Sequence, residues 1–429
     1  ATIAEMNPIL LKPQGDMTSQ VILRGRAIGR IEAKEYYEKF FDTGWQAIQE
    51  SLARLEQEFD LLVCEGAGSP AEINLKHRDL TNMRVAKHLN APTILVADIE
   101  RGGVFAHIIG TLELLDSDER SLIKGIIINK FRGRQELLQS GIDWLEERTG
   151  IPVIGVLPML DQAFPAEDSL SLLDRSPTNS AAALTIAVIR LPHISNFTDF
   201  DPLESEESVK VRYVSPKDDL GYPDAVILPG TKTTINDMMV LQRSGMAEAI
   251  KNYVHAGGTV LGICGGFQMM GEYLADPEGI EGQDGRYKGL ELVPIRTVIT
   301  NRKIARQRET SSQYPQVGLP ISGYELHQGR TQLVPAGESD NKAAQFDFLF
   351  EDKSLGIVDH RQALWGTYLH GLFDNGPWRR AWLNCLRQQR GLGSLPTGVA
   401  NYREQREMML DVLADSVESY LDLTPLLKH

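Results

Sequence analysis

One cysteine of this chain occupies a setting that exposes a nucleophile. Cys264 follows the apolar run 260–263 and precedes the periodic apolar run 267–274, so it is predicted to lie on a bend between a buried strand and a helix. Adjoining glycines allow a sharp backbone turn, and free N–H groups at a helix N-terminus favour thiolate over thiol. We therefore expect Cys264 to attack a carbonyl carbon, with the N–H of Gly265 facing the oxyanion.

The alternative is that Cys264 is a small apolar side chain packed in a core, as most unpaired cysteines are. Cys64 ends an apolar run and Cys385 lies in a helical stretch, and neither has a glycine next to it. Both are therefore expected to be structural. Three cysteines, of which one has a reactive setting, favour a reducing compartment such as the cytoplasm over a disulfide framework.

A thiol nucleophile needs a base, and His370 is the best candidate. The run 363–371 is predicted to be a strand that delivers His370 at its C-terminal edge, where α/β sheets place their chemistry. His327 is the rival, and a satisfied surface histidine is the alternative for His370 itself. The Cys and His residues lack the close paired spacings of zinc sites, so a metal centre is not expected here.

Two segments of the second half resemble the class I glutamine amidotransferases. Leu261-Gly262-Ile263-Cys264-Gly265-Gly266-Phe267-Gln268 is similar to their nucleophile elbow, and Leu228-Pro229-Gly230-Thr231 to their oxyanion loop. The resemblance implies that Cys264 forms a glutamyl thioester while His370 passes the proton to departing ammonia. It also implies that the N–H groups of Gly230 and Gly265 hold the oxyanion and that Gln268 helps to bind glutamine.

The chain departs from this family next to the histidine. Many relatives carry a glutamate two residues after it, and here that position is Leu372. A Cys–His dyad is therefore expected, unless another carboxylate such as Glu325 takes that place.

The motifs His-Gly-Leu-Phe at 370–373 and Gly-Tyr-Glu-Leu-His at 323–327 resemble the amidotransferases that act on corrinoids. The opening segment, Met6 to Pro13 followed by Thr18 to Val21, is similar to the members that amidate the b, d, e and g carboxylates of a corrinoid a,c-diamide. The resemblance implies glutamine and an anionic corrinoid as substrates. Amidation of another carboxylate, for example at the a and c positions, and a non-catalytic scaffold of the same fold are the alternatives.

The first part of the chain is predicted to be an α/β domain with a parallel sheet. Four apolar runs without alternation, separated by helical stretches, indicate strands buried on both faces: 60–65, 92–98, 125–130 and 153–158. The first three end in polar or glycine-rich segments that carry Glu65, Asp98 and Asn129. Polar side chains at the carboxyl ends of parallel strands line a ligand crevice.

This part resembles the dethiobiotin synthetase type of ATPase domain. The resemblance implies that Glu65 helps to hold Mg²⁺ near the phosphates of ATP, that Asp98 lies close to the metal and that Asn129 faces the adenine. A hard cation bound by one or two carboxylates and substrate phosphates is what phosphoryl transfer requires. No Gly-x-x-x-x-Gly-Lys-Ser/Thr loop occurs in the 429 residues. We therefore expect an N-terminally truncated chain in which ATP and Mg²⁺ belong to the full-length enzyme.

The expected division is a synthetase domain over 1–175, a polar Pro/Ser linker over 176–183 and a glutamine amidotransferase domain over 184–429. The segment 301–317 is expected to be an exposed loop, and helices over 377–387 and 403–423 are expected to close the second domain. A net charge of −14 without a Lys/Arg cluster argues against nucleic acid as a partner. No apolar run approaches the roughly 20 residues that a membrane span needs.

Overall fold

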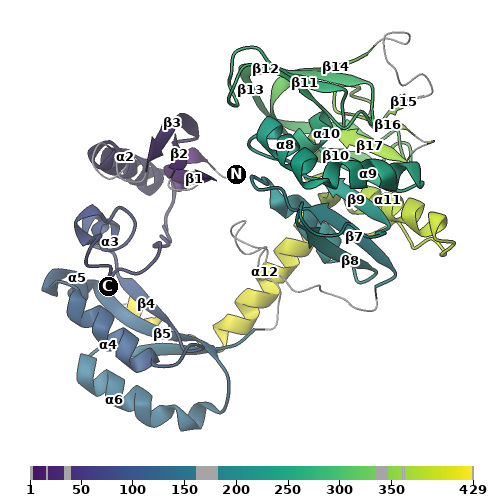
Figure 1. The fold of residues 1–429 in the computed structure, drawn as a ribbon. Coiled ribbons are helices and arrows are strands. Elements are labelled where there is room, and N and C mark those ends of the chain that lie inside the picture. The colour runs from purple at the N-terminus through teal and green to yellow at the C-terminus, as the bar shows by residue number, and fades with distance from the viewer. Residues whose placement is uncertain are drawn as a thin grey trace. The chain divides into compact units, whose positions relative to one another are not determined.

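The computed structural model describes residues 3–15, 18–32, 40–160, 182–334, 346–359, 361 and 363–427. The chain forms two compact units, Ala1–Ala163 with Leu410–His429, and Phe164–Met409 (Figure 1). Over the described ranges, every helix is too short or too polar to cross a membrane. The predicted linker 176–183 falls mostly outside the described residues, so its position remains a prediction.

The first unit contains an antiparallel sheet, a parallel sheet and the helices around them. Its elements in chain order are β1 (Ile9–Gly15), β2 (Thr18–Leu23), β3 (Arg26–Glu32), α2 (Phe41–Glu58), α3 (Met83–Leu89), β4 (Thr93–Asp98), α4 (Val104–Leu114), α5 (Ser117–Leu122), β5 (Ile123–Phe131), α6 (Gln139–Thr149), β6 (Val153–Pro158) and α13 (Thr424–Leu427). The sheets have the orders β1-β2-β3 and β4-β5-β6.

The strands β4, β5 and β6 pair in parallel, which confirms three of the four predicted strands. β5 is central and its isoleucines are buried on both faces, as the absence of alternation indicated. Ile108 of α4 and Leu145 of α6 pack on this sheet, and the two helices lie along it in Figure 1. This arrangement brings the carboxyl ends of β4 and β5 to one edge.

The predicted strand over 60–65 is wrong. This run is not a strand, and Leu61 and Val63 are 80% and 89% exposed. A strand needs a neighbour to satisfy its backbone N–H and C=O groups. Among the described residues, no strand pairs with this run, so its apolar composition alone does not hold it in a sheet.

The C-terminal stretch also differs from the predicted division. α12 (Tyr402–Glu418) is helical as expected, but Leu410–His429 belongs to the first unit and does not close the second. The backbone N–H of Asp422 donates to the carbonyl of Ile154 at 2.7 Å, and Leu421 forms a bridge with Gly155. β6 is an edge strand of the described sheet, so its unpaired backbone groups accept this tail.

The second unit contains a seven-stranded sheet of order β15-β16-β17-β10-β9-β7-β8 and a five-stranded sheet of order β12-β11-β13-β14-β18. Its elements are β7 (Leu184–Ile189), η5 (Phe197–Phe200), α7 (Asp201–Glu204), β8 (Val209–Val214), β9 (Ala225–Leu228), α8 (Thr234–Ser244), α9 (Met246–His255), β10 (Thr259–Ile263), α10 (Gly265–Met269), β11 (Tyr273–Asp276), β12 (Gly285–Lys288), β13 (Ile295–Ser311), β14 (Pro320–Leu333), β15 (Phe346–Phe348), β16 (Gly356–Asp359), β17 (Leu364–Thr367), β18 (Leu369–His370) and α11 (Gly376–Gln389).

The segment 301–317 is not the expected loop. Its residues up to Ser311 continue the long strand β13, which pairs with β14 in an antiparallel ribbon. The basic composition of the segment favoured a loop in the sequence. In the structure, Arg306 and Arg308 form ion pairs with Glu325 of β14. Cross-strand ion pairs of this kind allow polar strands to form.

The strands β10 and β17 place the predicted catalytic pair. They are neighbours in parallel register, with Ile263 opposite Thr367, and the N–H of Cys264 donates to the carbonyl of Thr367 at 2.8 Å. Cys264 follows β10, and His370 follows β17 through the short strand β18. Residues 106 positions apart in the sequence therefore meet at one sheet edge.

Candidate active site

Cys264 lies on a strained bend between β10 and α10. Its backbone angles are φ 53° and ψ −111°, a conformation that is uncommon for a residue with a side chain. A Cβ at Gly262 would come within 2.7 Å of the Phe267 Cα, and one at Gly266 within 2.0 Å of the Leu228 carbonyl oxygen. Only glycine fits at these two positions, which confirms the predicted elbow.

His370 is buried beside this bend and is held by a carboxylate. Its Nδ1 lies 2.7 Å from Oδ2 of Asp199, and Oδ1 of Asp199 accepts the N–H of Gly371 at 2.8 Å. Nε2 lies 3.0 Å from the side-chain amide of Asn196, and the ring of Tyr324 stacks on the imidazole. An ionised carboxylate only accepts hydrogen bonds, so Nδ1 carries a proton, and Nε2 is the ring nitrogen left to exchange a proton with a neighbouring group.

The surroundings of His370 favour its charged form. Burial by itself lowers the pKa of the imidazole, but the charge and hydrogen bond of Asp199 and the neighbouring thiol of Cys264 outweigh it. Together they raise the pKa of His370 to about 10. An imidazolium stabilised in this way is a suitable partner for a thiolate.

The structure adds a third residue, Asp199, to the expected pair of Cys264 and His370. The carboxylate that contacts His370 is therefore not Glu325. Asp199 lies in η5, after β7, and is 3% exposed. Glu325 binds Arg306, Arg308 and His327 instead. Leu372, at the position of the usual glutamate, is buried. The only sequence signal for Asp199 is a carboxylate in a loop after a buried strand, a pattern that many surface loops share.

The predicted oxyanion loop lies against the elbow. A Cβ at Gly230 would be 3.0 Å from Cε1 of His370, and one at Gly265 would be 3.3 Å from the backbone nitrogen of Thr231. The carbonyl of Gly230 accepts the N–H of Ser195 at 2.8 Å, which fixes the orientation of this loop. Gly230, Gly265 and His370 thus meet, and the oxyanion role of the two glycines stays a prediction.

Gln268 is 2% exposed and its amide is already bonded within the protein. Its nitrogen donates to the carbonyl of Gln328 at 2.9 Å and to the hydroxyl of Tyr368 at 3.2 Å, and its oxygen accepts from Thr234 at 3.3 Å. These bonds tie the helix after the nucleophile to β14. The predicted contact of Gln268 with glutamine is not tested by this arrangement.

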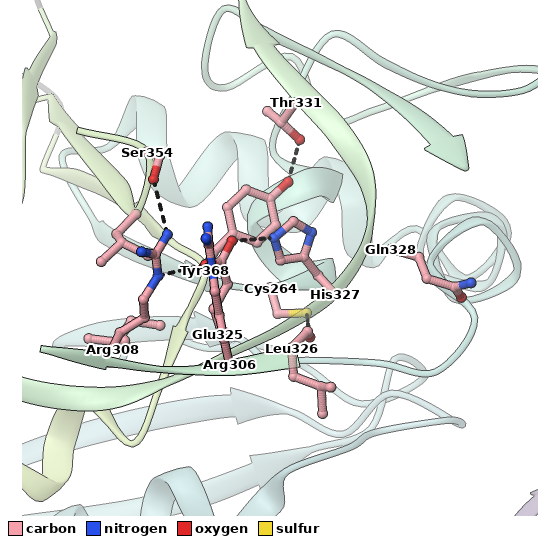
Figure 2. A network of polar contacts seen from close by, with 12 residues as sticks. Cys264, Arg306, Arg308, Glu325, Leu326, His327, Gln328, Thr331, Ser354 and Tyr368 are labelled. Atoms are coloured by element: carbon pink, nitrogen blue, oxygen red, sulfur yellow. Dashed lines mark hydrogen bonds and ion pairs between the residues drawn. The ribbon is translucent and has the colours of Figure 1, made fainter. Parts of the chain in front are cut away.

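A polar network on β14 forms one wall beside Cys264 (Figure 2). Sγ of Cys264 donates to the carbonyl of Leu326 at 3.2 Å. On either side of Leu326, Glu325 and His327 bond to each other at 2.9 Å, and the ring of His327 stacks on Tyr368 with centroids 3.9 Å apart. His327, the predicted rival base, therefore lies in the same site as His370.

In the first unit, the structure brings together two of the three predicted ATP-side residues. Asp98 and Asn129 are opposite each other at the ends of β4 and β5. Lys130 donates to Asp98 at 2.8 Å, and this bond lowers the pKa of the exposed carboxyl. Among the described residues, no contact joins Glu65 to Asp98 or Asn129. Within the same described part of the chain, no three His, Cys, Asp or Glu side chains lie together in a group that could hold a metal.

Comparison with known proteins accounts for both units. Residues 185–378 match the CobB/CobQ-like glutamine amidotransferase domain, and residues 31–166 match an AAA domain. The first range contains Cys264, His370 and Asp199. The second contains Glu65, Asp98 and Asn129. The matches confirm the predicted fold class, an ATPase-like α/β domain followed by a class I amidotransferase domain.

The chain is also similar to whole proteins of known activity. The cobyric acid synthase of Nostoc sp. (strain PCC 7120) is 70% identical over 423 residues, 99% of this chain and 85% of the relative. This chain belongs to the cobyric acid synthase family. The cobyric acid synthases of Trichormus variabilis and Synechococcus elongatus are 70% and 64% identical, over 98% and 99% of this chain and 85% of each relative. Membership of the cobyric acid synthase family confirms the resemblance drawn from the motifs.

Proposed function

We propose that this chain catalyses the glutamine- and ATP-dependent amidation of corrinoid carboxylates, as a cobyric acid synthase. The observation that supports this most strongly is the Cys264 elbow beside the His370–Asp199 pair, in a chain whose relatives carry that name over nearly its full length. The acceptors are the b, d, e and g carboxylates of the a,c-diamide.

The glutaminase step begins from the pair in which Sγ of Cys264 has given its proton to Nε2 of His370, a state that the raised pKa of the imidazole favours. The thiolate attacks the carboxamide carbon of glutamine, and the N–H groups of Gly230 and Gly265 bind the resulting oxyanion. His370 then returns the proton to the nitrogen as the C–N bond breaks, which releases ammonia and leaves a thioester. Water hydrolyses the thioester to glutamate and frees Cys264.

Asp199 keeps the proton of the imidazole on Nδ1 and stabilises the imidazolium between these two transfers. The carboxylate stabilises the imidazolium because it is buried next to the ring and can only accept hydrogen bonds. The same hydrogen bond fixes the orientation of the ring beside Cys264. The role follows the logic of a Ser-His-Asp triad with a thiol in place of the hydroxyl.

The first unit supplies the activation that the acceptor needs. A carboxylate resists attack by ammonia until the γ-phosphoryl group of ATP is transferred to it and makes phosphate the leaving group. Asp98 and Asn129 line the strand edge where a nucleotide would bind. By the resemblance to ATPase domains, Glu65 would help to hold Mg²⁺, which would neutralise phosphate charge when bound, while the carboxylate of Asp98 is bonded to Lys130.

The test measures glutamate release from glutamine by the chain and by Cys264→Ala, with and without MgATP and the corrinoid diamide. Glutamate from the parent and none from the variant would support the amidotransferase. Stimulation by the corrinoid a,c-diamide, but not by cobyrinic acid, would support the proposed acceptor over the a,c-amidating alternative. Equal release by parent and variant would contradict the role of Cys264.

A further inference from the structure

Glu325 is a buried carboxylate that the glutaminase steps above do not use. Its Oε2 accepts from Nε of Arg306 at 2.8 Å and of Arg308 at 2.7 Å, while Oε1 lies 2.9 Å from Nε2 of His327. Burial raises the pKa of a carboxyl, but these three hydrogen bonds outweigh it and lower the pKa of Glu325. Because the ionised carboxylate has no proton to donate, Nε2 of His327 must donate.

This assignment determines what the other ring nitrogen can do. In a neutral imidazole that carries its proton on Nε2, Nδ1 is a hydrogen-bond acceptor. Nδ1 of His327 is buried and meets no hydrogen-bond partner within the described part of the chain. The whole residue is 8% exposed. A buried acceptor without a donor costs about 1–3 kcal/mol, so its presence points to a ligand that donates.

The ring of His327 belongs to the wall of the nucleophile. The carbonyl of the preceding residue, Leu326, accepts from Sγ of Cys264 at 3.2 Å. The ring stacks on Tyr368, whose hydroxyl bonds to Gln268 in the helix that follows Cys264. Figure 2 shows Cys264, His327 and Tyr368 gathered at this stretch of β14. His327 is therefore part of the wall that borders Sγ.

We propose that Nδ1 of His327 accepts a hydrogen bond from an N–H group of the bound glutamine, and that Glu325 is a positioning residue that fixes the tautomer and orientation of the ring. The inference rests on the proposed glutaminase activity. Glutamine offers N–H donors at its carboxamide and at its α-ammonium group. Arg306 and Arg308 keep Glu325 ionised and thus maintain the acceptor.

Two substitutions separate the two nitrogens of His327. In His327→Gln, the amide reaches the position of Nε2 and can keep the bond to Glu325, but it offers nothing at Nδ1. In His327→Asn, the amide reaches the position of Nδ1 and gives up the bond to Glu325. We expect kcat/KM for glutamine to fall about 10- to 100-fold in His327→Gln, mainly through KM, and less in His327→Asn. A purely structural role of the Glu325 bond predicts the reverse order and would overturn the proposal.

The controls distinguish failure of the inference from failure of the proposed function. His255→Gln, at an exposed position of α9, should leave kcat/KM unchanged, and alkylation of Cys264 by iodoacetamide reports whether each variant keeps its elbow. No glutamine hydrolysis by the parent would refute the proposed function itself. Glutamate γ-methyl ester, which lacks the carboxamide N–H, identifies the donor. An effect of His327→Gln that is lost on the ester assigns it to the carboxamide, and an effect that persists assigns it to the α-ammonium group.

Discussion

Nδ1 of His370 lies 2.7 Å from Oδ2 of Asp199, a residue 171 positions earlier in the sequence. The carboxylate also accepts the N–H of Gly371, so it holds both the ring and the backbone that carries it. This chain therefore places a carboxylate on the histidine ring although Leu372 stands two residues after it. Asp199 contacts the histidine from η5, a different element of the same unit.

Replacement of Asp199 by asparagine should reduce kcat for glutamine hydrolysis by on the order of 10²- to 10⁴-fold, because the amide can donate to Nδ1 and favour the wrong tautomer. The charge of Asp199 raises the pKa of His370, so its loss should also lower that pKa. The basic limb of the pH profile of kcat/KM should then move to lower pH. Asp284→Asn, at an exposed position, is the matched control. An unchanged kcat in Asp199→Asn would show that the pair is not catalytic.

A methyl group at Gly266 should disrupt the elbow. A Cβ there would lie 2.0 Å from the carbonyl oxygen of Leu228 and 2.8 Å from that of Pro229, and backbone atoms cannot move aside cheaply. We expect Gly266→Ala to destabilise the second unit by about 1–3 kcal/mol and to lose glutaminase activity. Gly393→Ala, where a Cβ meets no atom within 4 Å, should do neither. Urea unfolding and glutamate release check both, and a fully active Gly266→Ala would contradict the described packing.

Arg379 should be required for the stability of the second unit. This arginine of α11 is 1% exposed, and it donates to Glu206 at 2.8 Å and to the carbonyl of Phe373 at 2.6 Å. Removal of Arg379 leaves the buried Glu206 with Arg380 as its remaining partner and the Phe373 carbonyl without this donor, so Arg379→Met should cost about 1–3 kcal/mol of unfolding free energy. Arg387, which is only partly buried and donates to a backbone carbonyl of a loop, gives the control Arg387→Met. A loss of stability in the control as large as that in Arg379→Met would refute a special role for the buried pair.

Glu281 should make the stability of the second unit depend on pH. Burial raises its pKa from 4.5 to about 7, and the charge of Asp276 adds to the effect. The folded state thus holds the proton more tightly than the unfolded chain. The resulting stabilisation is complete below 4.5 and is lost as pH rises through about 7. Relative to the parent, Glu281→Gln should become more stable as pH increases from 4 to 8.

Urea unfolding at several pH values measures this difference. Glu278→Gln is an exposed control three residues away, and its stability relative to the parent should not change over the same range. A difference between Glu281→Gln and the parent that stays constant with pH would show that Glu281 has an ordinary pKa in the folded state.

The sequence alone predicted the nucleophile and the base, and its motifs indicated the family to which the chain belongs. Cys264 could be identified because an elbow requires local features, a strand, a helix and glycines in consecutive positions, and local features are visible in a sequence. The unbroken isoleucine runs of β5 likewise indicated a buried parallel strand. His327, predicted only as a rival base, lies next to Leu326, whose carbonyl contacts Cys264.

Only the tertiary structure decided which groups surround these residues. Asp199 reaches His370 from η5, and Glu325 meets Arg306 across a ribbon, because side chains distant in sequence are brought together by strand order and register. The run 60–65 shows where the sequence misled the prediction. An apolar run becomes a strand only when a neighbouring strand forms hydrogen bonds with its backbone. Hydrogen-bond partners are a property of the folded arrangement, and no periodicity in the chain encodes them.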